Sequence, residues 1–378
     1  MPRPISVFIH SHALQHNLQH VRQHLQQQAL AAQSQPAWVW AVIKANAYGH
    51  GLPVAIKAFA QADGLAMLDF KEALACRDHG WHKPIMLLEG FFEAADVHVA
   101  AQYHLTCVIH SWHQIELLEA LSTELPAPLA IMLKLNTGMN RLGFMPSDYV
   151  AAFARLQRLQ QQRKITQLGK MTHFAQADES SSMTQEQMDC FMQTTQDLPG
   201  PISVCNSAAT LRNDIVSQCI HSEQWVRPGI CLYGSSPFAH QSAEQLGLLA
   251  AQSLCSEIIA VQQVPAGHGI GYGHRFIAPQ AMRVGVVACG YADGYPRHAP
   301  SGTPVQVANQ RTRLVGRVSM DMLVVDLSHL PQATVGSKVV LWGQDGPSVD
   351  EVAQASDTIG YELLCAVAPR VPRIIIPL

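Results

Sequence analysis

The sequence predicts an α/β fold, a (β/α)8 barrel followed by a mostly β domain. A length of 378 residues is more than one ordinary domain needs and fits two. Over the first part of the chain, short apolar runs alternate with helical stretches, which is typical of βαβ units. After about residue 237 the pattern changes to strands rich in Val and Ile with turn residues between them. We therefore expect a barrel over residues 1–240 and a β domain over residues 241–378.

Eight apolar runs predict the strands of the barrel. The first, Ala37–Ile43, is unbroken, as expected of a parallel strand that is buried on both faces. It follows an amphipathic helix, for which Ser11 is the expected N-cap. The remaining expected strands are Gly64–Asp69, Pro84–Gly90, Thr106–Ser111, Ile131–Thr137, Lys170–Phe174, Ser203–Ser207 and Trp225–Tyr233. Eight strand–helix units in about 235 residues match the usual size of such a barrel.

Six further runs predict the strands of the second domain. They are Ser256–Val264, Arg283–Ala288, Pro304–Ala308, Arg313–Val318, Leu323–Leu327 and Lys338–Trp342. Glycines at positions 302, 316, 336 and 343 fall where turns are needed.

The composition argues against several classes of protein. With 25 Lys and Arg against 28 Asp and Glu, the net charge is −3, and no basic block predicts nucleic-acid binding. No apolar stretch approaches the ~20 residues of a membrane span, and the first ten residues lack the apolar core of a signal peptide. The nine cysteines are scattered and never form a C-x-x-C pair, which indicates reduced thiols in a cytoplasm.

Histidines are numerous, at 19, so a metal site has to be considered. His16, His20 and His24 are spaced four residues apart on the predicted first helix, but no Cys, Asp or Glu nearby completes a ligand set. We expect a polar helix face there and no metal site.

Polar residues cluster at the C-terminal ends of the expected barrel strands, where barrel enzymes carry their chemistry. They are Lys44, Asp69, Glu89, Lys134, Asn136, His173, Asn206, Ser207 and Arg227. Lys44 closes the first apolar run, so burial should lower the pKa of its amine and favour a nucleophile that forms a Schiff base. On this residue alone, a surface lysine with its amine in water remains an alternative.

The segment that follows adds a resemblance. Residues 41–51 read A-V-I-K-A-N-A-Y-G-H-G, which resembles the signature of the alanine racemases, enzymes of fold type III that use pyridoxal 5′-phosphate. The resemblance implies that Lys44 binds this cofactor covalently and that Tyr48 contacts its phosphate. Further motifs follow in the family's order and extend the resemblance over almost the whole chain.

Two of these motifs carry side chains for the cofactor ring. Residues 134–144, K-L-N-T-G-M-N-R-L-G-F, resemble a family element in which Arg141 contacts both cofactor and substrate carboxylate. In that element Lys134 is often carbamylated and steadies Arg141, although an unmodified lysine paired with an acid stays open. The resemblance also implies that His173 lies beside the pyridine ring and binds Arg227, which faces the ring nitrogen. Because arginine is effectively always charged, Arg227 should disfavour protonation of that nitrogen.

Phosphate-binding residues are expected after the seventh and eighth strands, where barrels commonly bind phosphate. They are Asn206, Ser207, Gly229 and Ile230, and the resemblance adds Tyr361 from the C-terminal motif.

The second domain should complete the site. Residues 267–273, G-H-G-I-G-Y-G, lack the spacing of a dinucleotide fingerprint but resemble a family loop, which makes Tyr272 the second catalytic base. The resemblance also places Tyr291, Met320 and Asp321 beside the substrate carboxylate or its gate. Racemisation removes a proton on one face and returns one on the other, so Lys44 and Tyr272 would serve opposite faces. A tyrosine needs cationic neighbours to act as a base near neutrality, and in the family the His173–Arg227 pair supplies them.

The resemblance predicts an alanine racemase that works as a head-to-tail homodimer with shared sites. The reaction would supply D-alanine for peptidoglycan or serve the catabolism of alanine, and the sequence leaves both roles open. A racemase of broader specificity for serine, lysine or arginine is the main alternative. A non-catalytic cofactor carrier would lack the β domain, and a metal-dependent hydrolase would have only His173, with His110 or Asp69, as ligands. Departures from the family pattern occur at Asn136, Asn140, Ser319 and Ile9-His10-Ser11.

Overall fold

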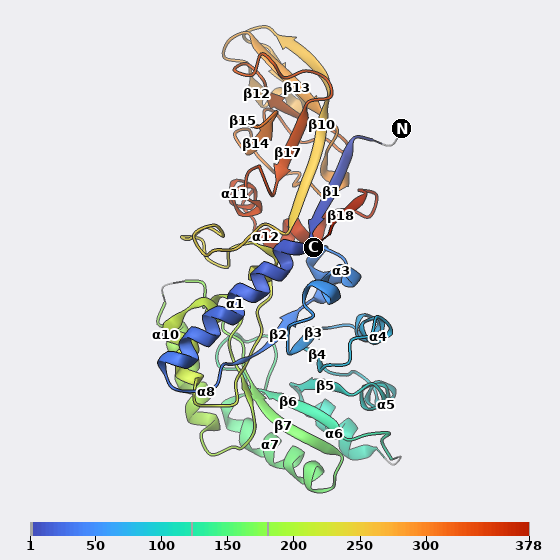
Figure 1. The fold of residues 1–378 in the computed structure, drawn as a ribbon, viewed down its shortest axis with the longest axis vertical. Helices are drawn as coiled ribbons and strands as arrows, with labels where there is room; N and C mark the ends of the chain where they lie inside the picture. Colours follow the sequence, from blue (N-terminus) through green and yellow to red (C-terminus); the bar gives the residue numbers. More distant parts are fainter. Residues whose placement is uncertain (1–2, 122–123, 180, 378) are drawn as a thin grey trace.

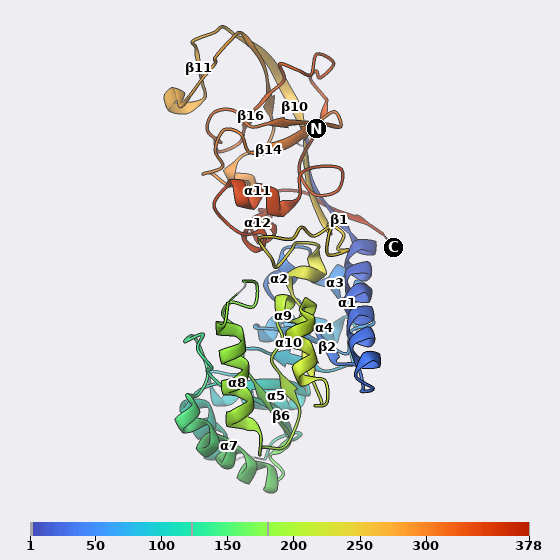
Figure 2. The same ribbon diagram turned by 90° about the vertical axis from the view of Figure 1, so that its left-hand side faces the viewer.

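Two sheets of eight strands each lie at opposite ends of an elongated molecule (Figures 1 and 2). The computed structural model describes residues 3–121, 124–179 and 181–377. Residues 1 and 378, the outer limits of the two expected domains, lie outside this range.

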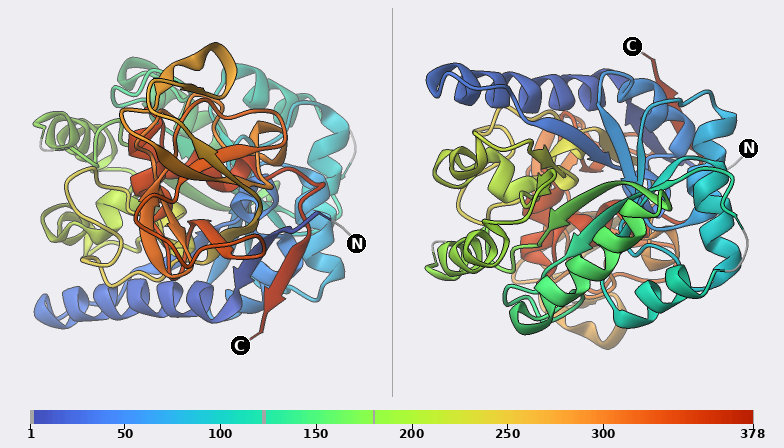
Figure 3. Two further views of the ribbon diagram at one scale, coloured as in Figure 1. Left: turned by 90° about the horizontal axis from the view of Figure 1, so that it is seen from above. Right: turned by 90° about the horizontal axis from the view of Figure 1, so that it is seen from below.

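The first sheet is the predicted barrel. Its strands are β2 (Trp38–Val42), β3 (Gly64–Met67), β4 (Ile85–Leu87), β5 (Leu105–Ile109), β6 (Leu129–Lys134), β7 (Ile165–Met171), β8 (Ile202–Ser203) and β9 (Trp225–Val226). They pair in parallel in the order β8-β7-β6-β5-β4-β3-β2-β9, and a single bridge between Ile202 and Gln224 links the two ends. Seen from below in Figure 3, helices surround the strands. Each strand lies within one of the eight predicted runs or overlaps it, so the barrel is confirmed.

Helices alternate with the strands of the barrel. They are α1 (Ser11–Ala31), α2 (Lys44–Tyr48), α3 (Leu52–Ala58), α4 (Phe70–Asp78), α5 (Ala94–Gln102), α6 (Trp112–Ala120), α7 (Pro146–Gln161), α8 (Met183–Thr195), α9 (Ser207–Leu211) and α10 (Asn213–Val216), with the 3-10 turns η1 (Ser217–Cys219) and η2 (Ile230–Tyr233). The N-cap prediction for Ser11 is wrong, because Ser11 is itself the first helical residue and is buried. His10 is the N-cap and makes no side-chain capping bond, since a strand runs directly into this helix.

The second sheet is mostly antiparallel, as predicted for a β domain. Its elements are β1 (Ile5–His10), β10 (Gln252–Val264), β13 (Met282–Val287), β14 (Pro304–Val307), β15 (Gln310–Arg313), β16 (Leu323–Asp326), β17 (Lys338–Trp342) and β18 (Arg373–Ile376). The run Arg313–Val318 was expected to be a strand, but the strand ends at Arg313. Gly316, at φ +79°, turns the chain there, and only Leu314 makes a further bridge.

The remaining elements belong to the second domain. They are the hairpin of β11 (Gly269–Ile270) and β12 (Phe276–Ile277), the 3-10 turns η3 (Tyr272–His274) and η4 (Tyr291–Asp293), and the helices α11 (Val349–Ala355) and α12 (Gly360–Ala366). Helix α12 lies at the junction and approaches α2 closely: a Cβ on Gly49 would lie 2.3 Å from the carbonyl oxygen of Leu364. Position 49 therefore requires glycine.

The chain begins in the second sheet, not in the barrel. Strand β1 pairs in antiparallel register with β10 and in parallel register with β18, and α1 then carries the chain down to the barrel (Figure 1). No strand was expected at this position.

Two further findings concern the whole described chain. All nine cysteines are free, and seven of them are buried. None of the helices in residues 3–121, 124–179 and 181–377 combines the length and the apolar character needed to cross a bilayer.

Candidate active site

A cavity of about 400 Å³ opens at the C-terminal ends of the barrel strands. It is lined by Val42, Lys44, Tyr48, Leu68, Leu88, Glu89, Lys134, Arg141, Leu142, Met171, His173, Asn206, Ser207, Arg227, Gly229, Ile230 and Tyr361. All the predicted cofactor-binding residues line this one cavity, together with Lys134. A closed parallel barrel explains this, because it brings the C-terminal ends of all its strands to one rim.

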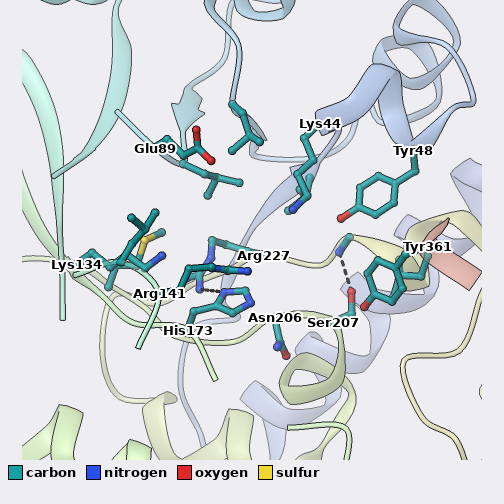
Figure 4. Close-up of a pocket in the computed structure, with 17 residues that line it drawn as sticks. Lys44, Tyr48, Glu89, Lys134, Arg141, His173, Asn206, Ser207, Arg227 and Tyr361 are labelled. Carbon is teal, nitrogen blue, oxygen red and sulfur yellow. Dashed lines mark hydrogen bonds between the residues drawn. The ribbon is translucent and has the colours of Figure 1, made fainter. Parts of the chain in front are cut away.

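Lys44 lies just after β2, and its side chain points into the middle of the cavity (Figure 4). Burial lowers the pKa of its amine below the ordinary value, and the Arg141 guanidinium lowers it further. The predicted direction of the shift is therefore confirmed. A lowered pKa leaves more of the amine neutral near pH 7, and the neutral amine is the nucleophile.

The turn that follows Lys44 is left-handed. Ala45, Asn46, Ala47 and Tyr48 have φ values from 51° to 55°. Side chains with a Cβ avoid this region, at a cost of about 1–2 kcal/mol per residue. Polar contacts support the turn: the Glu72 carboxylate accepts from the Asn46 amide at 2.7 Å, and the Asn46 side chain accepts from the Leu52 amide at 2.9 Å. The turn directs Tyr48 to the same cavity as Lys44.

Three hydroxyl groups meet at one end of the cavity. Those of Tyr48, Ser207 and Tyr361 face one another in Figure 4. Ser207 Oγ accepts a hydrogen bond from the Gly229 amide at 2.8 Å, and a Cβ on Gly229 would lie 2.5 Å from Tyr48 Oη. Burial raises the pKa of both tyrosines, so each hydroxyl keeps its proton as a donor. This end is built for an acceptor-rich group such as phosphate.

Arg227 and His173 lie together in the lining of the cavity, between the three hydroxyls and Lys134 (Figure 4). Arg227 is buried and donates to Ser203 Oγ at 2.5 Å, to the Thr172 carbonyl at 2.7 Å and to His173 Nδ1 at 3.3 Å. Burial lowers the pKa of Arg227 to about 10, so it remains charged at neutral pH. Burial and then Arg227 hold the pKa of His173 well below its ordinary value. The imidazole is therefore neutral beside a cation.

Lys134 lies at the end of β6 and is 7 % exposed. Burial, together with the charges of Arg227 and Arg141, lowers the pKa of its amine to about 8. Glu89 is the one acidic side chain among the residues that line the cavity, against two lysines and two arginines. The site is thus rich in positive charge.

Sequence reasoning gave several lining residues no role. Glu89 was noted at a strand end, which is the signal that could have placed it in the site. Val42, Leu68, Leu88, Leu142 and Met171 form apolar walls. No local pattern separates them from other core residues, so the fold was needed to find them.

Four of the five predicted site residues of the second domain do not line this cavity, and the fifth, Tyr361, does. Tyr272, Tyr291 and Met320 are 70 %, 39 % and 54 % exposed, and the Asp321 side chain is 45 % exposed. Tyr272 follows β11, which projects from the end of the molecule remote from α2 (Figure 2). Within one chain, Tyr272 is therefore separated from Lys44.

A buried carboxylate organises the loops that carry these residues. Asp293 accepts from Arg370 Nε at 2.8 Å and from Arg3 Nη1 at 3.0 Å, and Arg370 also donates to Asp321 at 2.6 Å. The Tyr291 amide donates to the Ser319 carbonyl at 3.1 Å, which joins the two loops directly. No sequence pattern had singled out this network.

Comparison with known proteins identifies the family. The model for "Alanine racemase, N-terminal domain" matches residues 9–237, and the model for "Alanine racemase, C-terminal domain" matches residues 251–375. An alanine racemase of Bordetella petrii is 58 % identical over 375 residues, covering 98 % of this chain and 99 % of its own. The chain belongs to the alanine racemase family.

Solved alanine racemases have the same fold. The biosynthetic alanine racemase of Pseudomonas aeruginosa superposes with a TM-score of 0.90 at 43 % identity, over 99 % of this chain and 100 % of its own. The alanine racemase of Acinetobacter baumannii superposes with a TM-score of 0.87 at 34 % identity, over 99 % and 100 %. Membership with both domains disfavours the carrier alternative, and the names of these relatives disfavour the broader-specificity one.

The departures from the racemase pattern have structural roles. Asn136 Oδ1 accepts from the Gly138 amide at 3.1 Å and from the Asn140 amide at 3.0 Å, so it shapes the loop before Arg141. His10 lies 2.9 Å from Ser253 Oγ, where α1 leaves the second sheet.

Among the described residues, no three His, Cys, Asp or Glu side chains gather as ligands of a metal ion would.

Proposed function

We propose that this chain interconverts L- and D-alanine with pyridoxal 5′-phosphate as cofactor and with Lys44 and Tyr272 as its two acid–base groups. Residues 1–240 hold the cofactor and residues 241–378 supply Tyr272, although β1 belongs to the second sheet. The position of Lys44 carries the proposal. Its amine has a lowered pKa and points into a cavity that two arginines and a second lysine also line.

The residues of the cavity fit the cofactor. The hydroxyls of Tyr48, Ser207 and Tyr361 suit its phosphate, with the backbone at Gly229 and Ile230 and the side chain of Asn206 beside them. Because Gly229 has no Cβ, it does not clash with Tyr48 Oη. The excess of cations suits a phosphate dianion. When bound, the cofactor withdraws electron density from the substrate α-carbon and so acidifies the α-proton.

The side chains of the protein divide the remaining work. Lys44 exchanges the proton on the face from which D-alanine loses it, and Tyr272 does so on the opposite face. Arg227 would face the pyridine nitrogen of the bound cofactor, and its permanent charge would disfavour protonation there, which would restrain side reactions such as transamination. Its neutral neighbour His173 keeps Arg227 in place beside the ring.

The substrate carboxylate is bound by Arg141, with Met320, Asp321 and Tyr291 at the entrance. Lys134 is carbamylated, because a neutral buried amine reacts with carbon dioxide and the resulting negative charge steadies Arg141 among the cations.

The enzyme works as a head-to-tail homodimer in which each subunit supplies Tyr272 to the other's cavity. This is supported by the exposure of Tyr272 and by its distance from the barrel mouth of its own chain (Figure 2). We infer a cytoplasmic enzyme whose reaction either supplies D-alanine for peptidoglycan or serves the catabolism of alanine.

A chiral assay tests the proposal directly. The purified protein with added cofactor is given L-alanine, L-serine, L-lysine and L-arginine, and each D-isomer is measured. We expect rapid conversion of alanine alone. Borohydride should fix the cofactor on the peptide that contains Lys44, read by mass, and the Lys44→Ala variant should show no adduct. No α-proton exchange with any of the four amino acids would refute the proposed reaction.

A further inference from the structure

His50 is a buried titratable residue that does not line the cavity and has no role in the proposed reaction. Its Nδ1 atom lies 3.1 Å from the Ala47 carbonyl oxygen and 3.0 Å from the Tyr48 carbonyl oxygen. Carbonyl oxygens only accept hydrogen bonds, so Nδ1 carries the proton and donates to both. Burial lowers the pKa of His50 to about 4, so the ring is neutral.

The Nε2 atom of the same ring is buried, and no atom of the described residues is its hydrogen-bond partner. An unpaired buried polar atom is unfavourable, and an apolar side chain of similar size would avoid it. What the imidazole offers instead is the Nδ1 donor, directed at the last two carbonyls of the strained left-handed turn. Such unfavourable groups cluster where a particular geometry is needed for function.

The His50 ring also supports Tyr48 from behind. Its centroid lies 4.7 Å from that of Tyr233, which in turn stacks on Tyr48 at 4.6 Å. Tyr233 donates from its hydroxyl to the Val42 carbonyl at 2.9 Å, two residues before Lys44. The imidazole is therefore linked to Tyr48 directly, through the Tyr48 carbonyl, and indirectly, through the Tyr233 ring.

We propose that His50 is a positioning residue for the cofactor phosphate: its Nδ1–H holds the left-handed turn so that the Tyr48 hydroxyl faces the phosphate. The inference rests on the proposed cofactor. It predicts that the contribution of His50 passes through Tyr48 and concerns the phosphate, not the aldehyde or the ring.

Three substitutions separate the donor from the bulk of the side chain. In His50→Asn, the amide Nδ2 takes the place of the imidazole Nδ1 and keeps the donor. In His50→Gln, the amide reaches the place of Nε2, so a buried polar group remains but the donor is displaced. His50→Leu removes both. The measurement is the dissociation constant of the cofactor-free protein for pyridoxal phosphate and for pyridoxal, which lacks the phosphate, with thermal unfolding of each variant as the control for folding.

We expect His50→Leu and His50→Gln to bind pyridoxal phosphate about tenfold more weakly than wild type, the size expected for one hydrogen bond. Their affinity for pyridoxal should change by less than about twofold, and His50→Asn should recover most of the lost affinity. In a Tyr48→Phe background, His50→Gln should weaken the binding of pyridoxal phosphate little further, because the Tyr48 hydroxyl that His50 positions is already absent.

Each opposite result overturns the inference. Equal loss of affinity for pyridoxal and pyridoxal phosphate would make His50 a general support of the barrel. Wild-type affinity in His50→Gln, or full additivity with Tyr48→Phe, would remove the link to the phosphate. If the wild-type protein bound neither compound, the proposed cofactor would fail and the inference with it, which distinguishes the two failures.

Discussion

The Nη2 atom of Arg227 lies 3.3 Å from Nδ1 of His173 in the lining of the cavity. A guanidinium has no acceptor, so the imidazole accepts there and its proton is on Nε2. Arg227 thus places a fixed positive charge beside the position proposed for the pyridine nitrogen of the cofactor. Burial, and after it the charge of Arg227, lowers the pKa of His173 and keeps the imidazole neutral.

Replacing this charge should change what the enzyme makes. Arg227→Gln keeps a donor but removes the cation, so we expect kcat for racemisation to fall by about 10²-fold. Transamination to pyruvate should rise relative to racemisation, because a more readily protonated ring is a stronger electron sink. Coupled assays of pyruvate and D-alanine measure the ratio. An unchanged ratio in a folded variant would contradict the role given to Arg227.

Gly229 should not tolerate a larger residue. In Gly229→Ala the new Cβ would lie 2.5 Å from Tyr48 Oη, so the tyrosine must move and affinity for the cofactor should drop about tenfold. In a Tyr48→Phe background the Gly229→Ala effect should shrink, because the clashing oxygen is absent. Equal effects in both backgrounds would exclude a steric cause.

Lys134 should take up carbon dioxide as pH rises. Only the neutral amine reacts, and the neutral fraction increases as pH rises through the pKa of about 8. With ¹³C-bicarbonate we expect a carbamate signal in wild type that grows from pH 7 to pH 9 and is lost in Lys134→Arg. Lys170 is the matched control: it is also buried, with a lowered pKa, but its amine donates to the Leu198 carbonyl. A signal that persists in Lys134→Arg and is lost in Lys170→Arg would assign the carbamate elsewhere.

Two inactive variants should restore activity when mixed. Lys44→Ala lacks one base and Tyr272→Phe the other, so a heterodimer with shared sites has one intact site. Random exchange makes about half the dimers mixed, which returns about a quarter of the wild-type sites. Activity is measured after subunit exchange has been verified by mass. Failure to recover any activity would place both bases in one chain.

The Asp293 network should govern substrate affinity. Asp293→Asn leaves Arg3 and Arg370 without their shared carboxylate, so we expect a loss of about 1–3 kcal/mol in the free energy of unfolding. Because Arg370 also holds Asp321, KM for alanine should rise at least as clearly as kcat falls.

Asp326→Asn provides the control for that prediction. Asp326 is similarly buried and pairs with Arg313 at 3.2 Å, but in β16, away from the loops of Tyr291 and Met320. The Asp326→Asn substitution should destabilise the protein and leave KM for alanine unchanged. Equal changes of KM in both variants would mean that KM follows stability alone.

Much of the site could be predicted because its residues lie in short motifs at strand ends. Lys44, Lys134, His173 and Arg227 each follow or end a parallel strand, and the closure of the barrel brings them together. Glu89 occupies an equivalent position but belongs to no motif, so its side chain was left without a role. The apolar walls, such as Leu88, were not predicted, because a leucine that faces the cavity has the same local pattern as one in the core.

The second sheet was harder to predict than the barrel. Its strands were found, but the strand expected from Arg313 is cut short by the turn at Gly316, and β1 was not expected. Strand β1 pairs with β10 across about 250 positions of the chain, and no periodicity within six residues identifies such a partner.

By itself the sequence determined the number and order of the barrel strands, the lowered pKa of Lys44 and the family. The spacing of apolar residues, the polar residues at strand ends and the family motifs are local properties of the sequence. They can therefore be recognised without coordinates. The tertiary structure decided the left-handed turn after Lys44, the donor that His50 directs at it, and the separation of Tyr272 from the cavity of its own chain. These three features depend on packing between segments that are far apart in the sequence. Only such packing can hold a strained turn in place or keep Tyr272 away from Lys44 of the same chain.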